Sequence, residues 1–255
     1  MVKRKIANLG VSLVGPAVLI VVLTMPIGPL AGGLQILIPW GGLFDVGRGM
    51  NEPYEQTVHL RGVSNDVNIL IDQFGVPHIY AATVEDAYVG LGYMHAKDRL
   101  FQMVIQNRLA AGRVSEIVGG YANSSDKLYR TIGLRRTAEE CLEWFEGNAD
   151  AVPEADYALR LMDAQVTGIN HFINTMTSEN TPIEFKILGV NPEPWTKVDM
   201  FLGASMITWG LTGDFDDLTR LWLRQTINND TIYDELYPDE MPYVSYTITE
   251  QTNLN

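Results

Sequence analysis

Side chains suited to acid–base or nucleophilic chemistry are few and widely spaced in this chain. His78 and His95 stand 17 positions apart, and no third ligand lies at helical spacing from either, so the pair predicts neither a metal site nor a general base. The single cysteine, Cys141, falls in an amphipathic helical pattern without a neighbouring cation that would favour a reactive thiolate. We expect structural roles for all three residues and no catalytic residue within this chain.

Two further sets of residues invite a functional interpretation. Asp98 and Arg99 stand together inside a half-apolar helical pattern, and we expect them to pair with partners inside the fold rather than to act on a substrate. Gly112 and Gly119 flank a predicted turn, and no Walker-type phosphate-binding pattern surrounds them. Neither set predicts a site of chemistry.

The composition limits the possible partners. The chain has 255 residues, enough for one or two domains, and a net charge of −13. Its first 44 residues hold three bases and no acid, so the remainder carries 15 bases against 31 acids. Such a body repels nucleic acid, and we expect no nucleic-acid partner.

The N-terminal region predicts contact with a membrane. Residues 1–5 form a basic cluster that we expect in the cytoplasm, and residues 6–38 form a transmembrane or signal-anchor region within an uncharged run that ends at Phe44. Residues 39–53, rich in glycine and proline, are predicted to be a linker. A retained anchor would leave the body outside the cytoplasm; the alternative is a cleaved signal peptide and a secreted body.

Residues 54–242 are predicted to form the folded domain, followed by a tail at 243–255. Alternation and β-branching predict a hairpin of strands at 67–72 and 76–81. Thr83 is the predicted N-cap of a helix that runs to about Met103, with Asp86 in the place of a capping-box acid. Further helices are predicted at 131–145, 153–176 and 198–228. Two strands cannot cover so many helices, so the chain is expected to fold around a partner.

Several motifs in this domain resemble one known family when they are taken together and in order. They are 75–81 (GVPHIYA), 92–103 (GYMHAKDRLFQM), 111–119 (AGRVSEIVG), 130–133 (RTIG), 164–173 (AQVTGINHFI), 182–185 (PIEF), 192–199 (PEPWTKVD) and 206–211 (MITWGL). Each is weak alone, but their order and spacing resemble the α chain of the penicillin acylase family of N-terminal-nucleophile hydrolases.

The resemblance implies half of an enzyme. The fold class would be α+β, mainly helical as an isolated chain, forming the α-chain portion of an αββα N-terminal-nucleophile hydrolase. In the family, the N-terminal Ser of a β chain cleaves a linear amide, its own α-amino group acting as the base. An oxyanion hole, also on the β chain, stabilises the intermediate. The pair Ser64-Asn65 resembles the start of a β chain but precedes the α-chain motifs, so we do not assign it that role.

The resemblance also implies what this chain would contribute. Met206 and Trp209 occupy the stretch that lines one wall of the acyl pocket, although Trp replaces Phe and the spacing is one shorter; simple core packing is the alternative. Asp217 matches best an α-chain acid that shares a calcium ion with the β chain, although the family has Glu there; a solvated acidic loop is the alternative.

Two functions follow from these observations. The first is the α-chain portion of a penicillin-acylase-like amidohydrolase, acting on the acyl side chain of β-lactams or on N-acyl compounds such as N-acyl homoserine lactones. This chain alone would be inactive. The alternative is a truncated, non-catalytic fragment that acts as a binding or assembly module or has no activity. A downstream reading frame that begins with Ser-Asn and an apolar strand would favour the enzyme.

Overall fold

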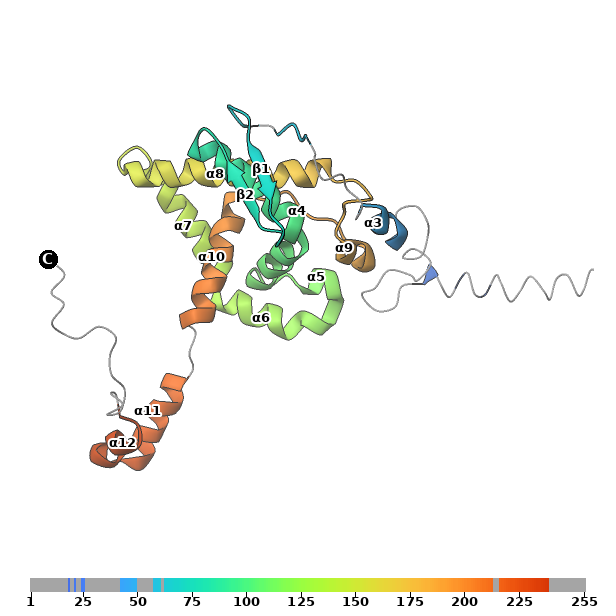
Figure 1. Cartoon of the computed structure of the whole chain (residues 1–255). Helices are drawn as coiled ribbons and strands as arrows, with labels where there is room; N and C mark the ends of the chain where they lie inside the picture. Colours follow the sequence, from blue (N-terminus) through green and yellow to red (C-terminus); the bar gives the residue numbers. More distant parts are fainter. Residues whose placement is uncertain are drawn as a thin grey trace, which may run out of the picture. The chain divides into compact units, whose positions relative to one another are not determined.

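A computed structural model of the chain describes residues 42–49, 57–60, 62–212 and 216–238, together with Val18, Val21, Thr24 and Met25. The chain divides into two units, one ending at Thr208 and the other beginning at Trp209. Figure 1 labels the α-helices and strands, which are α3 (Leu43–Gly49), β1 (Asn68–Ile71), β2 (Pro77–Tyr80), α4 (Val84–Ala110), α5 (Ser115–Val118), α6 (Asn123–Ile132), α7 (Leu134–Asn148), α8 (Pro153–Thr175), α9 (Ile183–Leu188), α10 (Lys197–Thr212), α11 (Asp216–Ile227) and α12 (Asp230–Leu236). A 3₁₀ turn (Gly119–Ala122) connects α5 to α6.

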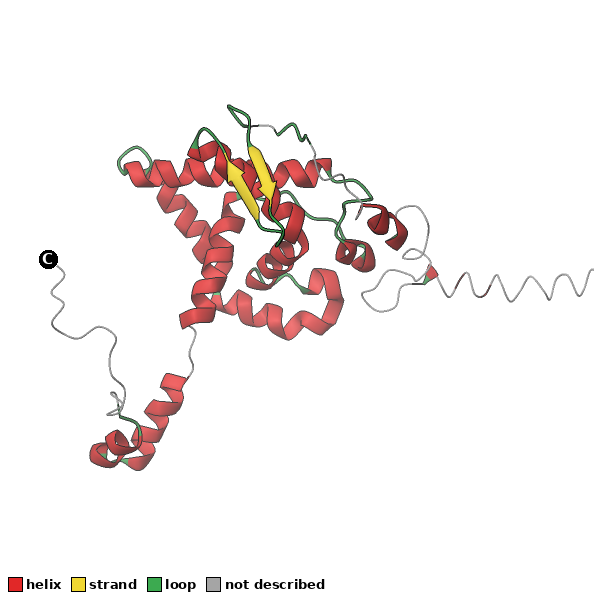
Figure 2. Cartoon of the chain, viewed as in Figure 1, coloured by secondary structure: helices red, strands yellow, loops and turns green. Residues whose placement is uncertain are grey.

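The predicted hairpin is confirmed and is the one sheet among the described residues (Figure 2). β1 and β2 pair antiparallel, with Ile69 opposite Ile79. The turn is closed by the carboxylate of Asp72, which accepts hydrogen bonds from the backbone N–H groups of Phe74 at 2.8 Å and Val76 at 3.0 Å. Gly75 adopts φ 78°, a conformation that glycine reaches without strain.

Helix α4 begins as the sequence predicts and continues further. The Thr83 hydroxyl accepts the backbone N–H of Asp86, the expected N-cap bond. The helix passes the predicted end near Met103 and kinks at Arg99, whose φ of −139° is not helical. Asp98 and Arg99 are both exposed, and Arg99 donates to the carbonyl oxygen of Asp98. The prediction that these two residues pair inside the fold is therefore wrong, because the kink lies at the surface.

The core of the larger unit is built where α4 packs against α8, whose bounds match the predicted helix at 153–176. The backbones approach so closely that a Cβ on Gly168 would overlap the carbonyl oxygen of Val89 and lie 2.7 Å from the Tyr93 nitrogen. A Cβ on Gly92 would likewise overlap the carbonyl oxygen of Gln165. Around this crossing lies the main cluster of buried residues, which are Ala96, Leu100, Val104, Ile169, Phe172, Phe185 and Trp195.

The remaining helices depart from the predicted boundaries at glycines and short connections. The predicted helix at 131–145 is two helices, α6 and α7, separated by Gly133 with φ 83°. The predicted helix at 198–228 contains α10 and α11, with residues 213–215 between them outside the described part. Residues 191–195, which contain two prolines, are not helical, and α9 forms just before them and places Phe185 in the core.

The predictions for the N-terminal region can be compared with the structure only where residues are described. Within the predicted linker, α3 forms and is held to the body, because the buried Asp45 accepts a hydrogen bond from the Ser178 hydroxyl at 2.7 Å. Across the described residues, no helix has both the length and the apolar character needed to cross a bilayer. The predicted membrane region 6–38 lies outside those residues except at four positions. The anchor stays a prediction, which membrane fractionation of the full chain tests.

We predict that Gly168→Ala lowers the free energy of unfolding by about 2–3 kcal/mol, because the new methyl group must push α4 and α8 apart. Urea denaturation followed by circular dichroism measures the change. The matched control is Gly147→Ala in α7, where an added Cβ meets nothing within 4 Å. That change should raise the stability by about 0.5–1 kcal/mol. Equal effects at the two positions would contradict the close-packed crossing.

Candidate functional site

The base of α10 is held by polar contacts from two helices of the core. Asn107, a buried residue of α4, donates from its side chain to the carbonyl oxygen of Asp199 at 3.0 Å. Asn170 of α8 donates to the carbonyl oxygen of Trp195 at 2.8 Å and accepts the Trp195 N–H at 2.7 Å. Since both backbone groups of Trp195 are bound in this way, the chain enters α10 along a fixed path.

The first turn of α10 is fixed by local bonds as well. The Asp199 carboxylate accepts the backbone N–H of Thr196 at 2.8 Å and its hydroxyl at 2.6 Å. On the outer side, Phe145 of α7 packs against Phe201, with ring centroids 5.2 Å apart. The start of the helix is therefore rigid, and its direction is set by the core.

The predicted pocket residues lie further along this helix. Met206 and Trp209 are both half-buried and are spaced three apart in α10, which places them on one face of that helix. Asp217 is exposed in the first turn of α11. The roles of Met206 and Trp209 in an acyl pocket and of Asp217 at a calcium ion stay predictions.

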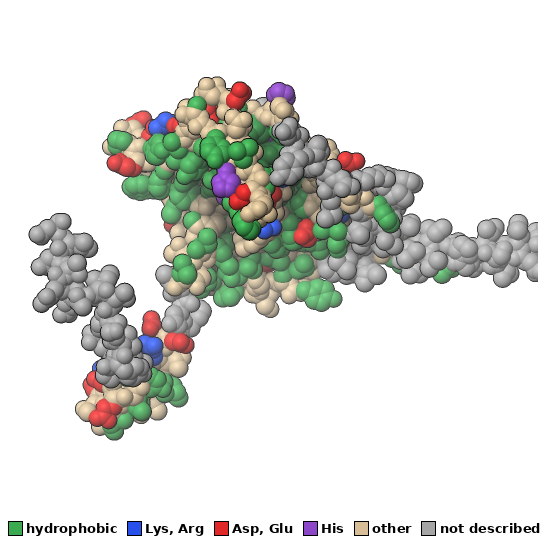
Figure 3. Space-filling view, in the orientation of Figure 1, with side chains coloured by type: hydrophobic (Ala, Val, Ile, Leu, Met, Phe, Trp, Pro, Cys, Tyr) green, Lys and Arg blue, Asp and Glu red, His purple; other side chains and the backbone are tan. Residues whose placement is uncertain are grey.

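Apolar side chains are exposed along α10 and on the hairpin. In α10, Ile207 is 66% exposed and Leu211 is 82% exposed. On the hairpin, Leu70 and Phe74 are 61% and 81% exposed. Hydrophobic side chains cover much of the face of the larger unit that Figure 3 shows. Large apolar side chains are therefore exposed on both elements.

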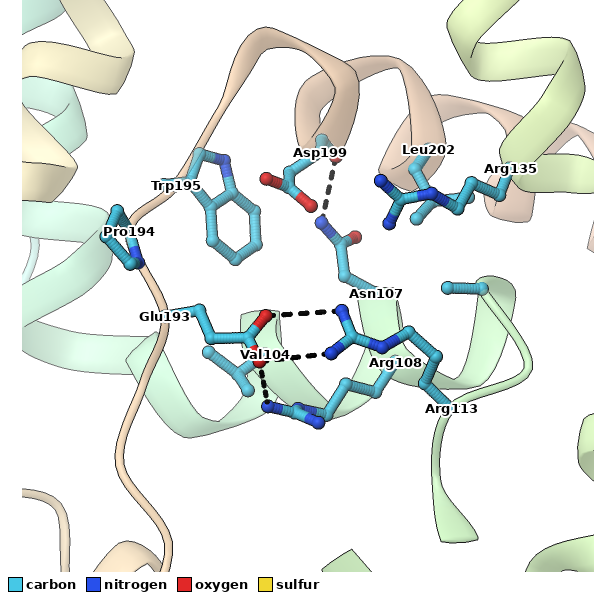
Figure 4. A pocket seen from close by; sticks show the side chains of 11 residues that line it. Val104, Asn107, Arg108, Arg113, Arg135, Glu193, Pro194, Trp195, Asp199 and Leu202 are labelled. Carbon is cyan, nitrogen blue, oxygen red and sulfur yellow. Dashed lines mark hydrogen bonds and ion pairs between the residues drawn. The ribbon is translucent and has the colours of Figure 1, made fainter. Parts of the chain in front are cut away.

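A small hollow of about 40 Å³ lies beside the base of α10. Figure 4 shows its polar wall, in which Glu193 reaches toward two arginines. Arg108 contacts Glu116 at 2.6 Å and Glu193 at 3.1 Å, and Arg113 contacts the same two carboxylates at 2.8 and 3.0 Å. This four-residue network joins α4, α5 and the connection that leads into α10. The hollow is large enough for ordered water but too small for an acyl substrate.

The network shifts the pKa values of its members. The hydrogen bond from Arg113 is the main reason that the pKa of Glu193 and the pKa of Glu116 lie below their usual value of 4.5. The same bonds raise the pKa of Arg113, with Glu116 as the largest cause. At neutral pH both carboxylates are therefore ionised, and the network serves as a structural clamp.

A buried carboxylate supports the loop that presents Arg113. Asp126 accepts the backbone N–H groups of Val114 and Ser115, each at 2.9 Å, and also the Ser115 hydroxyl. Burial alone would raise the pKa of Asp126, but these hydrogen bonds lower it overall. Gly112, with φ 65°, makes the turn before this loop, which agrees with the turn predicted there.

The other residues singled out in the sequence have structural partners. Ser64 lies within the chain, and its backbone N–H donates to the buried Asp86 at 2.7 Å. His78 contacts Asp72 at 3.2 Å, and His95 contacts Gln165 at 3.3 Å. Cys141 is half-buried in α7. In the part of the chain that the structure describes, no three His, Cys, Asp or Glu side chains gather in a group that could hold a metal ion.

Sequence reasoning missed the clamps at the base of α10. Asn107 and Asp199 are 92 positions apart, and Arg108 and Glu193 are 85 apart, so no local pattern pairs them. The sequence held one signal of these contacts, which was a polar residue on the mostly apolar, buried face of α4. Asn107 follows Val104 by three positions, and both are buried.

Comparison with known proteins adds to this picture. A family model described as Penicillin amidase matches residues 66–246. The penicillin acylase 2 proenzyme of Pseudomonas sp. (strain SE83) is 38% identical over 143 residues, which are 56% of this chain and 17% of that protein. The acyl-homoserine lactone acylase QuiP of Pseudomonas syringae pv. tomato is 31% identical over 207 residues, 80% of this chain and 24% of that protein.

A solved structure shows the same fold. A thermostable penicillin G acylase from Alcaligenes faecalis matches with a TM-score of 0.59 and 22% identity, over 72% of this chain and 97% of that chain. The chain spans about a fifth of the length of the curated relatives it matches.

We predict that the network of Arg108, Arg113, Glu116 and Glu193 makes the stability of the chain sensitive to acid. The pKa of Glu193 is lower in the folded chain than its usual value of 4.5, so ionised Glu193 stabilises the fold above that pH. This stabilisation is lost as the pH falls through the pKa of Glu193 in the folded chain. Glu193→Gln should therefore flatten the fall in melting temperature below about pH 4.5. The control Glu154→Gln, at an exposed carboxylate in α8, should keep the wild-type slope. An unchanged slope for Glu193→Gln would contradict the prediction.

Proposed function

Because the chain belongs to the penicillin amidase family, we propose that it is the α-chain portion of an amidohydrolase whose active site is completed by a second, β chain. The observation that carries this proposal is the family match over residues 66–246, in a chain that spans about a fifth of the length of relatives named as acylases. The apolar surface left exposed on α10 and the hairpin supports a large covering partner.

The reaction we propose is hydrolysis of a linear amide that carries an apolar acyl group. The relatives' names point to two classes of substrate, the side chain of a penicillin and an N-acyl homoserine lactone. The β chain would supply the N-terminal Ser as nucleophile, its α-amino group as base, and the oxyanion hole. The α chain would contribute one wall of the acyl pocket.

Helix α10 is suited to form that wall. Its base is immobilised by Asn107 and Asn170, so the position of the residues that follow is set by the core. Met206 and Trp209 share one face of the helix and present a thioether and an indole, two large apolar groups that can pack on an acyl chain. Rigid placement matters because pocket shape decides which acyl groups are accepted.

We also propose that Asp217 ligates a calcium ion shared with the β chain. Its carboxylate is exposed in the first turn of α11, beside Asp216, and so can reach a ligand outside this chain. Calcium takes six to eight oxygen ligands, and the described residues do not supply a group of three acids, so most of the ligands would come from the partner. The ion would join the two chains and would take no part in the bond cleavage.

The main test is activity with and without the partner. We predict that the purified chain hydrolyses a chromogenic phenylacetyl amide and a dodecanoyl homoserine lactone only at background rate. Co-expression with a family β chain that begins with Ser should restore hydrolysis of one of them. If the chain alone turns over substrate, and a substitution in this chain abolishes that turnover, the two-chain proposal fails. An inactive but assembled pair would favour a non-catalytic binding module instead.

In the assembled enzyme, Trp209→Ala should change the preference among acyl chains, because removal of the indole enlarges the pocket. Discrimination of about 1–3 kcal/mol per methylene is expected, measured as ratios of kcat/KM for a series of acyl lengths. The matched control is Trp144→Ala, an exposed tryptophan of α7 that is 54% accessible and lies outside α10. Identical acyl profiles for the wild type and the Trp209 variant would assign Trp209 to core packing.

Asp217→Ala should leave the acyl preference unchanged and reduce the rise in melting temperature that added calcium produces in the two-chain assembly, since a bound ion stabilises the state that binds it. Asp216→Ala is the control, because adjacent positions on a helix point about 100° apart. A full calcium response in the Asp217 variant would place this residue in a solvated turn.

A further inference from the structure

A second, wider pocket adjoins the small hollow and shares Ala111, Arg113 and Arg135 with it. It measures about 400 Å³ and is formed by the end of α4 and its following loop together with α6 and the start of α7. Its lining includes four arginines and one carboxylate, which are Arg113, Arg130, Arg135, Arg136 and Glu139. Four of the chain's 18 bases therefore line one pocket, and the carboxylates that pair with them offset part of their charge.

The guanidinium groups are only partly used by the protein itself. Arg113 is engaged by Glu116 and Glu193, and Arg135 pairs with Glu139 at 2.8 Å. Arg130 donates through Nε to the carbonyl oxygen of Gly112 at 2.8 Å, which fixes the guanidinium in place. Arg136 has a looser pair with Glu140 at 3.8 Å and is 74% exposed. Each guanidinium has five N–H donors, so Arg130 and Arg136 retain donors for an added ligand.

The position of the pocket adds to its positive potential. Arg135 and Arg136 fall in the first turn of α7, which contains no acidic residue and whose N-cap, Gly133, has no side chain. The partial positive charge of a helix N-terminus makes arginine unfavourable there and an anion favourable. The end of α7 therefore favours an anion at the same place as the arginines do.

We propose that this pocket binds a small oxyanion with two or more negative charges. Arg130 and Arg136 would hold it by charge-assisted hydrogen bonds, with Arg113 and Arg135 beside them. The pocket volume falls within the usual range for small-molecule sites, so the pocket has room for a ligand larger than a single inorganic anion. Its charged groups are phosphates or carboxylates. The site uses no residue of α10 or α11 and stands apart from the proposed acylase function.

Isothermal titration of the purified full chain at low ionic strength tests the proposal with three probes. Inorganic diphosphate and glycerol phosphate represent phosphate ligands, and citrate represents polycarboxylates. We expect saturable one-site binding of at least one probe. Arg136→Gln should weaken it about tenfold, since one charge-assisted contact is lost, and Arg136→Lys should retain part of it. The probe that binds most tightly shows whether the ligand belongs to the phosphates or to the polycarboxylates.

Two further variants complete the experiment. Arg130→Gln should also weaken binding about tenfold, with an unchanged circular dichroism spectrum as the check on folding. Arg160→Gln is the matched control, because Arg160 is 54% exposed and pairs with two carboxylates away from the pocket. Absence of saturable binding by all three probes overturns the proposal. So does equal weakening in the Arg136 and Arg160 variants, which would indicate diffuse attraction to surface charge.

Discussion

The close approach of α4 and α8 is the constraint on which the rest of the structure depends. Gly92 and Gly168 remove the side chains that would hold these helices apart, and the backbones meet at van der Waals distance. Residues on either side then pack efficiently, as in the edge-to-face contact of Tyr93 with Phe172 at 5.8 Å. Asn107 on α4 and Asn170 on α8 project from this pair of helices, and so the crossing also determines where α10 begins.

Polar groups as well as apolar ones connect this core to the start of α10. Asn107, Asn170 and the network around Glu193 fix the entrance to α10. Asn107 is buried, and its side chain would be costly to leave unpaired there. Large apolar side chains of α10 and of the hairpin remain at the surface, so the interior is well packed while part of the exterior is apolar.

Local signals in the sequence were sufficient for part of this fold. Alternation predicted the hairpin, Thr83 predicted the start of α4, and Pro153 predicted the start of α8. The exposure of Asp98 and Arg99 could not be predicted, because it depends on a kink at Arg99 that no proline or glycine marks. The partners of Asn107 and Arg108 lie more than 80 positions away and come close only through the helix crossing. The placement of Met206 on a face shared with Trp209 followed from helical spacing alone, and their role in an acyl pocket stays a prediction.

The helix crossing also bears on how the chain folds. Gly92 and Gly168 are 76 positions apart, so the core cannot form until a long intervening stretch, including α5, α6 and α7, has been synthesised and closed into a loop. Contacts between residues so far apart in the sequence form slowly compared with the formation of a helix. While the ribosome adds the residues between the two glycines, α4 is exposed with its apolar face uncovered. The α4–α8 core should therefore form only after most of α8 has been made, and before then the apolar residues of α4 are open to aggregation or to capture by a chaperone.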